Sequence, residues 1–112
     1  MSTPALQSFQ LIKDSNGNPG TEKIPACTYV TVAAVTSTAA TIIIPTGATT
    51  AIFTGTNNFY VNFTTTAVVP TVSVTDGSAA ALNPACRAVQ GLSSFSIIAP
   101  SDCFVNIEWY KD

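Results

Sequence analysis

Apolar and polar residues alternate with a period of two along much of the chain, which is the pattern of half-buried β-strands. The clearest example is the stretch 58–63. One of its faces carries Phe59, Val61 and Phe63, and the other carries Asn58, Tyr60 and Asn62. A second alternating run near the C-terminus places Trp109 on the same face as Val105 and Ile107. We expect that face, with the single tryptophan of the chain, to lie in the core.

Turn-forming residues separate eight such runs. The predicted strands are Ser8–Lys13, Thr28–Val35, Thr41–Ile44, Thr50–Thr54, Asn58–Phe63, Thr71–Val74, Ser94–Ile98 and Phe104–Tyr110. The best helical candidate is one turn at Ala79–Leu82, which Pro84 keeps short. The pattern therefore predicts a single all-β domain over residues 1–112, either a β-sandwich or jelly-roll-like, with seven or eight short antiparallel strands. Residues 1–7 are predicted to form an extended N-terminal arm.

Composition supports sheet over helix. Valine and isoleucine together number 19, against four leucines, and serine and threonine add 27 residues. β-Branched side chains fit the pleated surface of a strand, whereas helices favour leucine and long charged residues. The ten aromatic residues supply further apolar surface for a core.

Charge is scarce, and this changes the functional picture. Only ten residues are charged, the net charge is −2, and the 52 residues from Ile24 to Thr75 carry none. Without a basic patch we expect no nucleic-acid binding. Thr, Ser and Asn can keep such a surface hydrated, but the cores of protein interfaces are also depleted in charge. We expect much of this surface to contact other protein.

The chemistry of an enzyme is missing from the sequence. The chain has no histidine, which is the commonest general base and metal ligand. Asp76 and Asp102 could pair in principle, as could Asp14 and Glu22, but loop solvation accounts better for all four carboxylates. The segment from Asp14 resembles the start of a calcium loop, but prolines occupy its sixth and twelfth positions. We expect no catalysis, no metal and no cofactor.

Three cysteines, Cys27, Cys86 and Cys103, form an odd set without close spacing. We expect reduced, mostly buried thiols and not a disulfide framework. The first ten residues lack the features of a secretory signal, and no apolar run approaches the ~20 residues of a membrane helix. These features favour a protein made in the cytoplasm, with no membrane partner.

Four side chains are the candidates for contact with a partner. Tyr60 and Asn62 lie opposite the apolar face of their strand, and Phe104 and Tyr110 lie opposite Trp109 on the last strand. Aromatic residues are enriched in interface cores, which favours these positions.

The C-terminal half resembles a family of small accessory proteins on the virions of tailed bacteriophages. The runs that carry the resemblance are Asn58–Phe63, Pro70, Val74–Ser78, Leu82–Ala85, Ser94–Pro100 and Val105–Tyr110, which together cover about half the chain. The resemblance implies a capsid decoration (cement) protein on the outer surface of the head, which bridges subunits of the major capsid protein. It carries over no catalytic residue. On such a lattice we expect self-association as a dimer or trimer.

Two alternatives stay open. A phage tail or fibre component would also be a small structural β domain. A carbohydrate-binding β-sandwich module would use Tyr60, Phe104 or Tyr110 as a stacking platform for sugar rings.

Overall fold

The computed structural model of the chain describes residues 4–8 and 24–112, and this part is built from nine strands with no helix. The strands are β1 (Gln7–Ser8), β2 (Val30–Val35), β3 (Ala40–Ile43), β4 (Thr50–Gly55), β5 (Tyr60–Asn62), β6 (Ala81–Leu82), β7 (Cys86–Ala88), β8 (Ser94–Ile98) and β9 (Cys103–Lys111). The predicted all-β class is confirmed.

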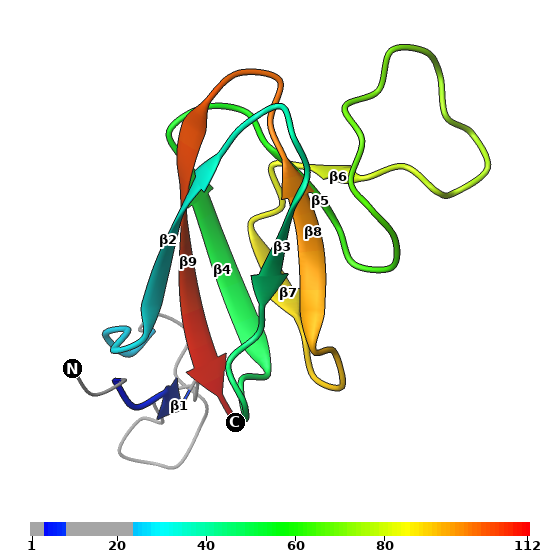
Figure 1. The fold of residues 1–112 in the computed structure, drawn as a ribbon. Coiled ribbons are helices and arrows are strands. Elements are labelled where there is room, and N and C mark those ends of the chain that lie inside the picture. Colours follow the sequence, from blue (N-terminus) through cyan, green and yellow to red (C-terminus); the bar gives the residue numbers. More distant parts are fainter. Residues whose placement is uncertain (1–3, 9–23) are drawn as a thin grey trace.

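The strands form two sheets that face each other (Figure 1). In the first sheet β9 lies between β4 and β2, β7 lies beyond β4, and the short β1 joins β9 past the end of β2. The second sheet has the order β3-β8-β5-β6. All pairs are antiparallel except β1 with β9. The strand orders 2-9-4-7 and 3-8-5-6 are those of a jelly roll, in which eight antiparallel strands alternate between two sheets.

The core lies between the sheets and follows the period of two. Val105, Ile107 and Trp109 of β9 are fully buried, as predicted. Phe95 of β8 lies 5.6 Å from Phe53 of β4 and 6.0 Å from Trp109, measured between ring centroids. Such aromatic pairs add about 0.5–1.5 kcal/mol beyond the area that they bury. The Trp109 indole also donates a hydrogen bond of 2.9 Å to the Thr31 hydroxyl, so its one polar atom is satisfied.

Strand predictions hold best for the last two strands, whereas the predicted strand Asn58–Phe63 is shorter in the structure, as β5. The run Ser94–Ile98 matches β8 in both bounds, and the last predicted strand is extended by one residue at each end. The helical turn at Ala79–Leu82 is wrong, because Ala81–Leu82 pairs with β5 as strand β6. The predicted strand Thr71–Val74 is also wrong, since these residues belong to a loop. Of the predicted strand Ser8–Lys13, only Ser8 lies within the described residues, and it belongs to β1.

The described part of the predicted N-terminal arm lies along the chain's own first sheet. Gln7 and Ser8 pair with Tyr110 and Lys111, and Leu6 packs against the core. The Thr28 hydroxyl donates a hydrogen bond to the Ala5 carbonyl. Residues 6–8 therefore extend the first sheet and its core beside the end of β9.

Candidate interaction surface

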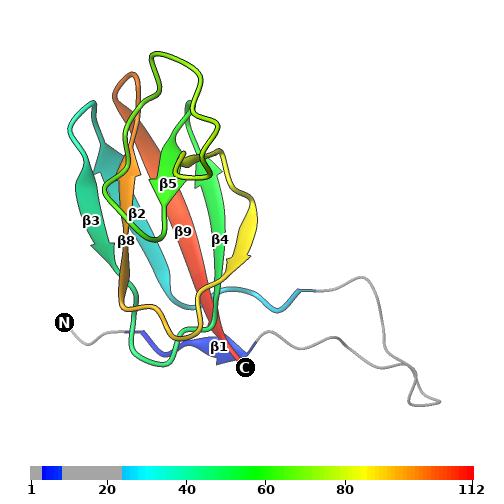
Figure 2. The ribbon, with the colours of Figure 1, turned by 90° about the vertical axis from the view of Figure 1, so that its right-hand side faces the viewer.

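A long loop, residues 63–80, leaves the sandwich between β5 and β6 (Figures 1 and 2). Three of its large apolar side chains are exposed: 65% for Val68, 74% for Val72 and 42% for Val74. Asp76 is the only charged residue in the loop. Exposed apolar residues grouped on one projection are unusual on a free surface and mark interaction sites.

Asn62 joins the two ends of this loop, residues 63–65 and 78–80, which we call its neck. Its Oδ1 accepts hydrogen bonds from the backbone N–H groups of Thr64 and Thr65 and from the Thr64 hydroxyl, each at 3.0 Å. Its Nδ2 donates to the carbonyl of Ser78 at 3.2 Å, which ties the start of the loop to its end. The side chain is buried, so the expectation that Asn62 faces outward to a partner is wrong. Its burial follows from the loop residues that fold over it.

One further hydrogen bond fixes the loop near its start. The N–H of Ala67 donates to the Ser96 hydroxyl at 2.8 Å, which places the buried Ala67 on the outer side of β8. Between the loop and its neck lies a shallow, mostly apolar cavity of about 240 Å³. Its wall includes Val68, Pro70 and Val74. The loop that carries the exposed valines is therefore held to the sandwich by hydrogen bonds at its two ends and at Ala67.

The return of the chain from the loop depends on Asn83. This residue has a positive φ of 46°, a region that asparagine tolerates better than most residues. Its N–H donates to the Phe59 carbonyl at 2.9 Å, and its Oδ1 accepts from the Phe59 N–H at 3.0 Å. Its Nδ2 donates to Asn58 Oδ1 at 3.0 Å. Asn83 thus extends the short β5–β6 pairing by side-chain contacts.

Phe104 is the predicted contact residue that the structure places fully outward. It is 58% exposed on the outer face of β9. Its strand partner is Ala34 of β2, and the neighbouring positions of β2 on that face are Val32 and Val30. Val32 is 60% exposed and Val30 45%. The outer face of the first sheet therefore carries a second apolar patch, made of Val30, Val32, Ala34 and Phe104.

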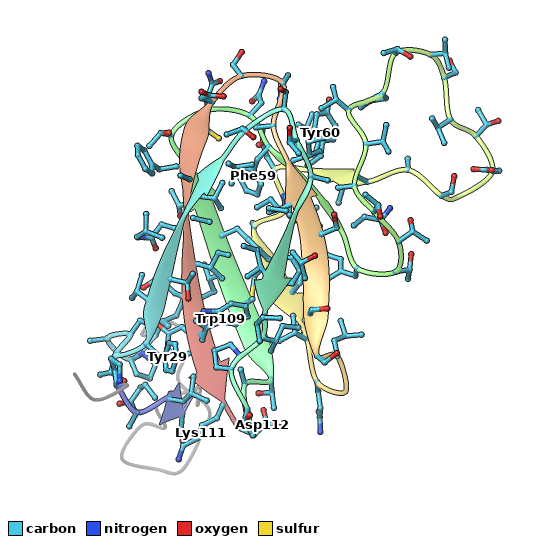
Figure 3. All side chains as sticks on the ribbon, in the orientation of Figure 1. Tyr29, Phe59, Tyr60, Trp109, Lys111 and Asp112 are labelled. Atoms are coloured by element: carbon cyan, nitrogen blue, oxygen red, sulfur yellow. The ribbon has the colours of Figure 1, made fainter. Side chains whose placement is uncertain are left out.

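Tyr110 does not reach this surface. Alternation along β9 directs it to the outer face, but it is only 2% exposed (its neighbours Trp109 and Lys111 are labelled in Figure 3). Its hydroxyl donates to the Pro25 carbonyl at 2.9 Å, so the segment that leads into β2 covers it. Burial raises the pKa of Tyr110, and the nearby Cys27 and Glu108 raise it further. The expectation that Tyr110 faces outward is wrong.

Tyr60 is half-buried on the outer face of the second sheet (labelled in Figure 3), opposite Leu82 and Ile98 in the strand register. Phe104 lies on the outer face of the other sheet, and Tyr110 is buried. The three aromatic residues therefore do not form one stacking platform. A polar groove of about 430 Å³ does cross the second sheet, and its wall includes Thr41, Asn62, Thr64 and Ser96.

The described residues contain no group of three or more His, Cys, Asp or Glu side chains that could hold a metal ion. Asp76 accepts hydrogen bonds from the backbone and hydroxyl of Ser78 at 3.0 and 2.6 Å, and these bonds lower its pKa. Asp76 is thereby a turn residue. Asp102 is exposed at the β8–β9 connection. Asp14 and Glu22 lie outside the described residues.

The three cysteines are free thiols in different surroundings. Cys103 is buried, Cys27 is half-buried and Cys86 is exposed. The expectation of mostly buried thiols therefore fails for Cys86, because the short strand β7 at the sheet edge gives its side chain no cover. The Cys27 thiol lies 3.2 Å from the carbonyl of Tyr29 and donates to it.

The described residues include no helix that is long and apolar enough to cross a membrane. Comparison of the chain with protein-family models, with curated proteins and with solved structures found no match.

Proposed function

We propose that this protein is a structural component of a tailed-phage virion: a capsid decoration (cement) protein that binds the major capsid protein and bridges its subunits on the outer surface of the head. The proposal rests on the resemblance of the C-terminal half and on the surface described above. A jelly roll alone carries no function, because the fold is shared by unrelated proteins.

The observation that carries the proposal is the loop 63–80. It presents Val68, Val72 and Val74 on a base that Asn62 fixes through hydrogen bonds to both of its ends. Fixing the base lowers the entropy that would be lost when the loop docks. A loop of this kind fits a shallow apolar recess between subunits better than it fits a small ligand.

A repetitive lattice suits such a contact. One loop of this size buries too little surface for a tight interface between two isolated proteins. When many copies act on one shell, contacts that are individually weak reinforce the whole assembly. The scarcity of charge supports the same view, since the cores of interfaces are depleted in charged residues.

The test is binding to purified heads that lack the protein. Wild-type protein should bind with a fixed number of copies per head, counted by quantitative mass spectrometry and located by electron microscopy. Val72→Asp should reduce the occupancy, because it forces a charge into an apolar contact. Thr46→Asp, which adds the same charge at an exposed turn outside the loop, should bind like wild type.

Two outcomes would overturn the proposal. If the protein is found on tails or fibres only, the virion role survives and the decoration role does not. If it is absent from particles, the polar groove of the second sheet becomes the leading site, because its hydroxyl groups are suited to hydrogen-bonding a sugar. Binding on a glycan array, lost on Thr41→Val, would then support the carbohydrate-binding alternative.

A further inference from the structure

Strand β2 forms an open edge of the first sheet. Within the part of the chain that the structure describes, β2 pairs with β9 on one side and with no strand on the other. In Figure 1 it runs along the left margin of the sandwich. An edge strand presents unpaired backbone N–H and C=O groups, which are a template for pairing with another strand.

The hydrogen-bond register shows which backbone groups face this edge. The N–H of Trp109 donates to the Tyr29 carbonyl at 3.0 Å, so Tyr29 bonds directly to β9. Bonded and non-bonded positions alternate along an antiparallel pair. Thr31 and Ala33 therefore bond to β9, while the N–H and C=O groups of Val30, Val32 and Ala34 point away from it.

The β2 edge lacks the usual protection against pairing. Native edges are blunted by charge, proline, bulges or short length. Strand β2 has six residues, and none is charged or a proline. Its pairing with β9 runs without interruption from Val30 to Val35, so it contains no bulge.

The edges on the other side of the sandwich differ. Strand β7 has three residues and carries Arg87, and β6 has two residues and is followed closely by Pro84. Both are therefore protected by short length, and each has a charge or a proline in or near it. Strand β3, the other edge of the second sheet, is also uncharged, but it has only four residues and Pro45 follows it closely. Among the edges that the structure describes, β2 is therefore the longest without a charge or a proline in or near it, and we take this as the sign of an edge open for pairing.

We propose that the β2 edge pairs with the β2 edge of a second copy of this chain, antiparallel about a two-fold axis, to form one sheet across the dimer. A two-fold contact places identical residues opposite each other, so a charged edge would repel itself. The uncharged β2 edge is compatible with its own copy. This inference goes beyond the proposed function and does not depend on it.

The register of such a dimer follows from the backbone geometry. The axis passes beside Val32, which then faces Val32 of the second copy, and Val30 faces Ala34. All three residues direct their N–H and C=O groups to the edge, so each pair can exchange hydrogen bonds. Their side chains lie on the outer face, where Val30 and Val32 are exposed in the monomer. Pairing joins the apolar patches of the two copies into one surface.

The experiment is sedimentation of the full chain over a range of concentrations. Wild type should show a monomer–dimer equilibrium. Val32→Lys should raise the dimer dissociation constant by more than about tenfold, since it brings two like charges together at the axis. The exposed side chain of Val32 lets the monomer fold unchanged, which circular dichroism and thermal melting check. The matched control Thr54→Lys adds the same charge on the outer face of β4, away from the edge, and should dimerise like wild type.

A mixing experiment identifies the partner. Val32→Lys and Val32→Glu should each be monomeric alone and should form a one-to-one heterodimer when mixed, because opposite charges then meet across the axis. A wild-type protein that stays monomeric overturns the proposal. So does a dimer that Val32→Lys leaves intact, or a pair of variants that fails to associate on mixing. Loss of head binding by Val72→Asp with dimerisation retained would separate this contact from the one in the proposed function.

Discussion

At the scale of single residues, two asparagines hold the loop 63–80 to the sandwich through side-chain hydrogen bonds. Asn62 and Asn83 satisfy backbone groups that no strand partner reaches, one at the neck of the loop and one at the return from it. Amide side chains can do this because each carries both a donor and an acceptor. In a domain with few charged residues, these amides replace the ion pairs that often fix loops.

Asn62→Ala should destabilise the fold by about 1–3 kcal/mol, because it leaves the N–H groups of Thr64 and Thr65 without their acceptor. Chemical denaturation measures the change in the free energy of unfolding. Asn106→Ala, at an exposed position of β9, is the control and should change it by less than about 0.5 kcal/mol. Equal effects at the two positions would contradict the anchoring role of Asn62.

Tyr110 should make stability depend on alkaline pH. Because its pKa is higher in the folded protein than in the unfolded chain, its stabilising effect is complete below about pH 10. The effect is lost as the pH rises through the folded pKa, since the unfolded chain then ionises more readily. The urea midpoint should therefore fall less between pH 8 and pH 11 in Tyr110→Phe than in wild type. Equal falls would show that other groups control alkaline unfolding.

At the scale of elements, the sequence predicts a strand when the strand's own residues alternate between apolar and polar, and it misses strands that depend on pairing with another segment. Strands β8 and β9 follow from alternation alone, and so does the core position of Trp109. Strands β6 and β7 are too short to have a period, and they exist because β5 and β4 pair with them. The burial of Asn62 and Tyr110 depends on segments that fold over them from elsewhere in the chain. No local pattern contains that information.

The loop 63–80 should be the first cleavage site for thermolysin, which cuts before large apolar residues. Val68, Val72 and Val74 are exposed, and residues 71–79 are all exposed, so a protease can bind the backbone there. The apolar strands β8 and β9 should resist, because their backbone is paired in the sheets. Mass spectrometry of early fragments should show cuts between residues 67 and 74. First cleavage within the described strands would contradict the exposure of the loop.

At the scale of the whole molecule, the features combine into a domain with a well-packed interior and an unusually uncharged exterior. One apolar projection, the loop 63–80, stands on the second sheet, and a second apolar patch lies on the outer face of the first. The two apolar surfaces therefore lie on two sides of the molecule. Contact on two sides is what the proposed bridging role requires.

The proposed cement role predicts that heads lacking this protein release their DNA at a lower temperature than complete heads, or after chelation of stabilising cations. In that role, binding to the assembled shell stabilises the shell by mass action, whereas free capsid subunits offer no bridging site. Release is measured by the fluorescence of a DNA dye during heating. Adding wild-type protein to the deficient heads should restore the higher temperature, and Thr46→Asp should do the same. Val72→Asp should restore it only in part, because fewer copies bind. Deficient and complete heads that release DNA at the same temperature would contradict the cement role even if the protein is bound.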